Sequence, residues 1–200
     1  SGGAAKGLAH IGVLKALEEN DIRIDYIVGT SMGAIIGGSY AAGMSPAQLE
    51  ELVLSEDFLM WIKGGNAEGL NYYYYQGKQD PGFVRINLAL DSTFNFQFNS
   101  TIANDLSLNF VLAELTAPAI SICKGDFDSL FVPLRVVTAD VFTQSEVVIG
   151  KGNLSDAIRA SQSVPFFYSP TKIDGKYLFD GGVYNNFPVD VMMDTFHPDV

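Results

Sequence analysis

The chain has 200 residues, 48% of them hydrophobic, and a single cysteine, Cys123. This length suits one domain with a sizeable core, and one cysteine excludes an internal disulfide framework and a cysteine-based zinc site. The formal net charge is −11, and because phosphate binding needs clustered Lys or Arg, nucleic acid is excluded as an expected partner. The sequence shows no run of about 18 apolar residues, so we expect no bilayer-spanning segment and only apolar or local lipid contact.

The first third of the chain predicts a helix, a short buried strand and two further helices. The first helix repeats an apolar residue every three positions, at Leu8, Ile11, Leu14 and Leu17. Residues 26–28 predict the strand, and the Gly- and Ala-rich stretch 32–42 predicts a helix packed closely on a sheet. A capping box at 45–48, with proline in the first helical position, begins a helix that runs to about Leu54.

The middle, from about Gly64 to Gly125, is aromatic and rich in turn residues. Within it Phe94, Phe96 and Phe98 alternate as on one face of a strand. Residues 104–115 then predict a helix that Pro118 ends.

The last third returns to alternating strands and helices. Strand patterns occupy 130–142 and 145–150, and 154–164 predicts a helix with Ser155 as its N-cap. Asp174-Gly175, between β-prone flanks, predicts a hairpin. Strands that alternate with helices indicate an α/β layered domain with a largely parallel sheet.

Residues 29–33, with the sequence GTSMG, fit the G-x-S-x-G pattern of a nucleophile elbow. The predicted strand before and helix after it would expose the Ser31 hydroxyl at a helix N-terminus, and glycines at 29 and 33 would relieve crowding in the turn. Such a terminus favours a developing oxyanion. The alternative is a glycine-rich turn in which Ser31 only caps the helix.

A second glycine-rich turn opens the chain, with Gly2, Gly3, Ala4, Ala5, Lys6 and Gly7. It is not a P-loop, because Leu8 stands where Ser or Thr is needed, and Ala4 replaces the second glycine of a dinucleotide fingerprint. What remains is a loop whose backbone N–H groups point into a cavity. If that cavity holds Ser31, the loop is an oxyanion hole.

A partner for the serine must be found among few candidates. Only His10 and His197 could complete a Ser-His-Asp triad, and neither lies in a supporting motif. Asp180 is the better candidate, because it follows a predicted hairpin strand and precedes Gly181 and Gly182, which allow close backbone approach. Ordinary turn chemistry is the alternative for this aspartate.

Together these three elements resemble the patatin-like phospholipase family, which combines a glycine-rich oxyanion loop, a G-x-S-x-G elbow and a late Asp-Gly-Gly/Ala. The stretches KGLAHIGVLKALEE, IDYIVGTSMGAIIGG and AIRASQSVPFFYSP are similar to its bacterial members. The resemblance implies a three-layer α/β/α sandwich, with Ser31 as nucleophile and Asp180 as proton acceptor. It implies an oxyanion loop at 2–4, with Lys6 beside it.

One position departs from the family pattern, which has glycine where Ala4 stands. Alanine still supplies an N–H group. If the position requires a positive φ, the methyl group costs roughly 1–2 kcal/mol and could misdirect the loop. Reduced activity is then expected.

The function expected is that of a serine lipid acyl hydrolase, acting on phospholipid esters through an acyl-enzyme without metal or cofactor. Burial beside 177–179 would raise the basicity of Asp180. Two alternatives stay open. One is a weak or inactive patatin-like module used for binding in a larger envelope protein, supported by Ala4, and the other is a Ser-His-Asp esterase.

The surroundings of the domain follow from the same resemblance and from the chain ends. We expect peripheral membrane contact. From the residues alone, the aromatic middle lines an acyl groove or forms a lid, and the alternative is that Phe94, Phe96 and Phe98 on one strand face belong to the core. We expect 1–200 to be a single catalytic domain truncated at both ends, accompanied by further domains. The bacterial relatives imply a bacterial protein at the cell envelope or a membrane.

Overall fold

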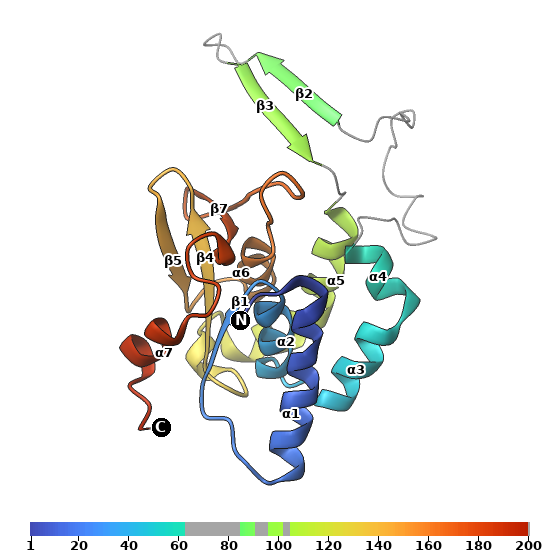
Figure 1. The fold of residues 1–200 in the computed structure, drawn as a ribbon, viewed down its shortest axis with the longest axis vertical. Coiled ribbons are helices and arrows are strands. Elements are labelled where there is room, and N and C mark those ends of the chain that lie inside the picture. Colours follow the sequence, from blue (N-terminus) through green and yellow to red (C-terminus); the bar gives the residue numbers. More distant parts are fainter. Residues whose placement is uncertain (63–84, 91–95, 102–104, 200) are drawn as a thin grey trace.

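The computed structural model describes residues 1–62, 85–90, 96–101 and 105–199 (Figure 1). Its helices and 3₁₀ turns are η1 (Ala4–Leu8), α1 (Ala9–Glu19), α2 (Met32–Ala41), α3 (Pro46–Leu54), α4 (Glu56–Ile62), α5 (Leu106–Cys123), η3 (Phe127–Ser129), α6 (Leu154–Ser161), η4 (Gly181–Val183) and α7 (Val189–Phe196). Its strands are β1 (Ile27–Thr30), β2 (Arg85–Leu90), β3 (Phe96–Thr101), β4 (Leu134–Asp140), β5 (Ser145–Ile149), β6 (Thr171–Ile173) and β7 (Lys176–Asp180).

The main sheet has the order β1-β4-β7-β6, with β5 also paired to β4. Strand β1 lies parallel to β4, whereas β4–β5, β4–β7 and β6–β7 are antiparallel. The described strands therefore make a mixed sheet rather than the largely parallel one expected. Two of the antiparallel pairs have a local reason: the short turns at 141–144 and 174–175 leave no room for a crossover helix, so β4–β5 and β6–β7 are hairpins.

Strand β4 shows that the sheet is covered on both faces. Leu134 faces α2, because a Cβ built at Gly38 would lie 3.8 Å from its Cδ2 atom. The next residue, Arg135, points to the other face and stacks over the Phe196 ring of α7. Helices α2 and α6 pack on β4, with α1, α3 and α5 beyond them, and α7 packs on β1 (Figure 1). This arrangement confirms the α/β/α layers.

The Gly- and Ala-rich helix α2 packs as closely as its composition predicts. A Cβ at Gly37 would lie 2.8 Å from Ile27 Cγ2, and one at Gly38 would lie 2.7 Å from Ile158 Cδ1. Nearly every residue of α2 is buried. The small side chains therefore let this helix sit directly between β1 and α6, where it can hold the turn that precedes it.

The caps of α3 and α6 test two further predictions. Helix α3 has the full capping box, in which Ser45 Oγ accepts the Gln48 N–H and the Gln48 side chain accepts the Ser45 N–H. Helix α6 is capped by Asn153, whose side chain accepts the Ser155 N–H, so the prediction of Ser155 as the cap was wrong. Asparagine and serine are about equally good N-caps, and composition alone does not separate them.

Pro118 lies inside α5 instead of ending it. The carbonyl that loses its hydrogen bond to proline belongs to Glu114, and both residues are exposed. Water can therefore replace the missing bond, and the helix continues to Cys123.

Helix α5 also meets, by length and composition, the criterion for a membrane-crossing helix, contrary to the expectation of no such segment. Core helices of globular domains pass the same test. Here α5 packs against α6, and Leu108, Leu112 and Cys123 are part of the buried core. Its apolar character is thus explained in part by the core of the domain.

In the aromatic middle, β2 and β3 form an antiparallel ribbon. Strand β3 confirms the strand predicted around Phe96 and Phe98, whereas β2 was not predicted. Phe94 lies outside the described residues, as does most of the segment expected to form a groove or lid.

Candidate active site

Ser31 stands at the sharp turn between β1 and α2. Its φ of 55° and ψ of −123° are uncommon for a residue with a side chain and are the geometry that an abrupt strand-to-helix turn imposes. A Cβ at Gly29 would lie 2.7 Å from Gly33 O, and one at Gly33 would lie 2.7 Å from Ser1 O. The predicted strand–turn–helix is confirmed, and glycine is required at both flanks.

The register of the sheet brings Asp180 to Ser31. Thr30, just before the serine, lies opposite Val137 of β4, and Asp180 at the end of β7 lies opposite Thr138. Ser31 Oγ donates to Asp180 Oδ2 over 2.6 Å, and each residue is only 7% exposed. Ser31 occupies the N-cap position of α2, but its side chain makes no capping bond to the helix, and its hydroxyl bonds to Asp180 instead.

The surroundings of the pair raise the basicity of the Asp180 carboxylate. Burial raises the pKa of the Asp180 carboxyl above its ordinary value, and the hydrogen bonds from the Ser31 hydroxyl and the Gly182 N–H partly oppose this rise. A raised pKa makes the ionised carboxylate a stronger base. The basicity that burial was expected to give Asp180 is confirmed in direction.

The end of α6 holds both residues of the pair, a feature that the sequence analysis did not single out. Ser161 Oγ accepts the Ser31 N–H over 2.8 Å and donates to Val137 O over 2.6 Å. The Ser163 carbonyl accepts the Asp180 N–H over 2.9 Å. Ser161 ends α6 and Ser163 follows it, both fully buried, and this pair in RASQSVP could have signalled the role, because buried hydroxyls need partners.

The N-terminal loop lies against Ser31. A Cβ built at Gly2 would lie 3.2 Å from Ser31 Cβ and would overlap the Asn186 side chain, so only glycine fits. The Gly2 N–H donates to Asn186 O over 3.1 Å. Gly2 therefore fastens the loop rather than offering its N–H to a substrate, which corrects its predicted place among the oxyanion donors. Gly3 follows with a φ of 156°, which also favours glycine.

The remaining loop residues continue into the 3₁₀ turn η1. Ala4 has a φ of 46°, so the positive φ considered for this position is present, with its cost of roughly 1–2 kcal/mol. Lys6 is exposed, and its N–H donates to Gly3 O over 3.0 Å. Gly7 is buried, and a Cβ there would lie 2.6 Å from Met32 Cβ, which holds the turn close to the start of α2.

The two histidines make other contacts. His10 Nε2 is hydrogen-bonded with the Ser1 carbonyl over 2.9 Å, and His197 caps the end of α7. In the part of the chain that the structure describes, no hydrogen bond joins either ring to Ser31 or Asp180. Over the same residues, no group of three or more His, Cys, Asp or Glu could hold a metal ion.

The glycines after Asp180 allow the aspartate to approach β4. A Cβ at Gly181 would overlap the Val137 carbonyl oxygen, and one at Gly182 would lie 2.9 Å from Asn186 Oδ1.

Gly181→Ala should lower the free energy of unfolding by about 1–3 kcal/mol, because backbone must move to admit the methyl group. Gly12→Ala on α1, where nothing lies within 4 Å, should instead raise it slightly. Urea unfolding of both variants checks this, and equal stability of the two would contradict it.

Comparison with known proteins gives the family. The patatin-like phospholipase model matches residues 1–193, and the chain belongs to this family. An uncharacterized NTE family protein of Mycobacterium tuberculosis is 29% identical over 187 residues, which cover 94% of this chain and 42% of that protein. The patatin-like phospholipase domain-containing protein 6 of Mus musculus is 27% identical over 192 residues, 95% of this chain and 12% of that protein. The chain thus spans less than half the length of these relatives.

A solved structure supports the same fold. The crystal structure of VipD from Legionella pneumophila aligns with a TM-score of 0.56 over 94% of this chain and 46% of that chain, at 16% sequence identity. At this identity the likeness establishes the patatin-like architecture alone.

Proposed function

We propose that this protein is a serine hydrolase that cleaves acyl esters of lipids, with phospholipids as the substrate class, through a Ser31–Asp180 dyad. The observation that carries the proposal is the 2.6 Å hydrogen bond from Ser31 Oγ to Asp180 Oδ2 in a buried site at a strained elbow. Membership of the patatin-like phospholipase family supports the lipid substrate.

In the proposed reaction the Ser31 hydroxyl attacks the ester carbonyl carbon while Asp180 accepts its proton. The tetrahedral intermediate collapses, and the departing alcohol takes the proton from Asp180. Water then attacks the acyl-enzyme with Asp180 as base, which releases the fatty acid and returns the proton to Ser31. The raised pKa of Asp180 suits a group that must both accept and return a proton.

The oxyanion is assigned to the N–H groups of Gly3 and Ala4. The N–H groups of Gly2 and Ser31 are already donated to Asn186 and Ser161, which leaves the next two amides of the loop for the substrate. Each such donor typically contributes about 2.7–4 kcal/mol to the transition state.

Peripheral contact with a lipid surface is part of the proposal. Phe187 lies on the segment that follows Asp180, and Phe166 on the segment that follows α6; both rings are more than two-thirds exposed, at 71% and 77%. Because the net charge of the chain is −11, such contact would rest on apolar insertion rather than on attraction to anionic lipid. Further domains, expected from the relatives' greater length, would complete the protein.

A fluorophosphonate probe, which reacts with activated serines, tests the proposal against its alternatives. Wild type, His10→Ala and His197→Ala should all be labelled, and all should hydrolyse a p-nitrophenyl acyl ester and phosphatidylcholine vesicles. Loss of turnover in either histidine variant would favour a Ser-His-Asp esterase. An unlabelled, well-folded wild type would favour the inactive binding module, for which the φ of 46° at Ala4 is the supporting observation.

A further inference from the structure

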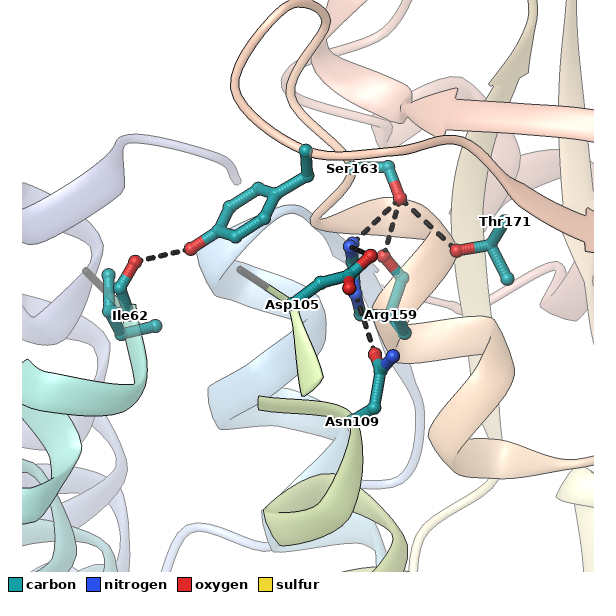
Figure 2. Close-up of polar contacts among 7 residues, drawn as sticks. Ile62, Asp105, Asn109, Arg159, Ser163 and Thr171 are labelled. Carbon is teal, nitrogen blue, oxygen red and sulfur yellow. Dashed lines mark hydrogen bonds and ion pairs between the residues drawn. The ribbon is translucent and has the colours of Figure 1, made fainter. Parts of the chain in front are cut away.

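A buried cation lies behind the catalytic pair. The side chain of Arg159, on α6, is only 5% exposed, and each of its three nitrogens donates a hydrogen bond. Nε donates to Asn109 Oδ1 over 2.8 Å, Nη1 to Ser163 Oγ over 2.8 Å and Nη2 to Asp105 Oδ2 over 2.9 Å (Figure 2). The guanidinium also stacks over the Tyr168 ring, 4.7 Å from its centroid.

Such a cation is costly to bury. Desolvation lowers the pKa of Arg159, and the Asp105 carboxylate, itself a third exposed, opposes that shift. An apolar side chain of similar volume would fill the space without this cost, so a buried ion pair is weak evidence of a role in stability alone. What a planar fork with five fixed N–H donors provides, and an apolar residue does not, is defined geometry.

The Arg159 guanidinium bonds directly to Ser163, the residue whose carbonyl holds Asp180. The Ser163 hydroxyl accepts from Arg159 Nη1, donates back to the Arg159 carbonyl over 3.0 Å and lies 3.2 Å from Thr171 Oγ1 on β6. The carbonyl of the same serine accepts the Asp180 N–H. One residue therefore joins the arginine to the backbone of the proposed base.

The other end of the network is fixed to two helices. Asp105 and Asn109 lie at the start of α5, and the Tyr168 hydroxyl donates to the Ile62 carbonyl at the end of α4. Figure 2 shows Asp105 and Asn109, from the start of α5, beside the Arg159 guanidinium. It also shows Ser163 between the guanidinium and Thr171 of β6. The end of α6 is thus held from both sides, by the sheet through Ser161 and by the helices through Arg159.

We propose that Arg159 is a positioning residue of the hydrolase: its fork fixes Ser163, and through the Ser163 carbonyl it holds the Asp180 carboxylate in line with the Ser31 hydroxyl. The inference rests on the proposed function. It assigns Arg159 no contact with substrate. It predicts that a positive charge at position 159 is not enough to keep Asp180 in place, and that the three directed hydrogen bonds of Arg159 are needed for this.

Arg159→Lys tests this directly, because lysine keeps the charge but cannot bond three partners in one plane. For a soluble p-nitrophenyl ester we expect kcat to fall about 10- to 100-fold, the size of effect that small misplacements of a catalytic group produce, with KM changed less than about twofold. The acidic limb of the pH profile should move to lower pH, because a loosened, better hydrated Asp180 loses the burial that raises its pKa.

Arg135→Lys is the matched control. Like Arg159, Arg135 pairs with a carboxylate and lies over an aromatic ring: it donates to Asp128 through two nitrogens and lies 4.8 Å from the Phe196 centroid. It makes no hydrogen bond to Ser163 among those of the described residues. Its replacement should leave kcat and the pH profile as in wild type.

Ser163→Ala gives a second, milder test in case Arg159→Lys does not fold. It should lower kcat in the same direction, and the double variant should lose less than the sum of the two single free-energy effects. Hydrogen exchange at the Asp180 amide should quicken in both variants. Lowered melting temperatures with wild-type kcat, pH profile and Asp180 exchange would overturn the inference.

Failure of the inference differs from failure of the proposed function. If the fluorophosphonate labels wild type at Ser31 and Arg159→Lys behaves like wild type, only the positioning role is lost. If wild type is neither labelled nor active, the hydrolase proposal fails, and exchange at the Asp180 amide still decides whether Arg159 holds that residue.

Discussion

Ser31→Ala should lower the rate of acyl-ester hydrolysis by at least about a thousandfold and abolish fluorophosphonate labelling. The physical reason is that the acyl-enzyme route needs an oxygen at this position, and removal of a serine nucleophile leaves only the catalysis due to binding and the oxyanion hole. The effect should fall on kcat, because the ester and acyl-chain contacts remain. Steady-state kinetics on a p-nitrophenyl ester and on vesicles measures it.

Ser39→Ala is the matched control for this substitution. Ser39 lies on the same helix α2, is 1% exposed, and its hydroxyl has no hydrogen-bond partner among the described residues. Removing that oxygen should leave turnover unchanged and cost little stability. Turnover that persists in Ser31→Ala at the wild-type rate would refute the dyad, whatever the result at Ser39.

Asp180→Asn should lower kcat by about 10²–10⁴, the usual contribution of a positioned general base. Asparagine has the shape of aspartate: its oxygen can keep the Gly182 N–H bond, but its amide cannot accept the Ser31 proton. The variant should also lose the acidic limb of the pH–rate profile, because that limb reports protonation of Asp180. A profile measured between acidic and neutral pH with one ester checks both results.

The same substitution should stabilise the fold at neutral pH. Because the folded-state pKa of Asp180 is raised, its contribution to the free energy of unfolding is fully present below the ordinary carboxyl pKa and is lost as pH rises through the raised value. Asparagine does not ionise, so the variant does not lose this stability as pH rises. The difference in free energy of unfolding between Asp180→Asn and wild type should therefore vanish in acid. Asp174→Asn, at the exposed hairpin turn, should change neither activity nor this pH dependence. An Asp180→Asn protein less stable than wild type at neutral pH would contradict the burial argument.

Short-range signals predicted the pair Ser31 and Asp180 well. The elbow depends on glycines within two residues of Ser31. Asp180 follows a hairpin whose turn is predicted by the dipeptide Asp174-Gly175. Such features depend on local sterics, which residue type determines directly. The helices α1, α2 and α3 were predictable from signals of equally short range: apolar periodicity, Gly- and Ala-rich composition, and a capping box.

Long-range features were less predictable. Ser161 bonds to Ser31 at the elbow, Ser163 to Asp180 on β7, and Arg159 to Asp105 at the start of α5. No pattern along the chain indicates that these distant residues come into contact. The role of Gly2 was likewise misassigned, because its N–H finds a partner at Asn186, which is distant in sequence. Pro118 was predicted to end its helix, but the helix continues because the proline lies on the solvent-facing side, which the local sequence does not reveal.

The hydrogen bond between Ser31 and Asp180 joins groups 149 positions apart. During synthesis the alcohol therefore leaves the ribosome long before the last strand of the sheet exists, and domains complete their fold only when such distant strands are present. In the proposed mechanism, an emerging or partly degraded polypeptide carries Ser31 but lacks Asp180, the base that would activate it. For the proposed hydrolase, activity would therefore begin only when the whole domain has been made, and a cut that releases β7 would abolish it.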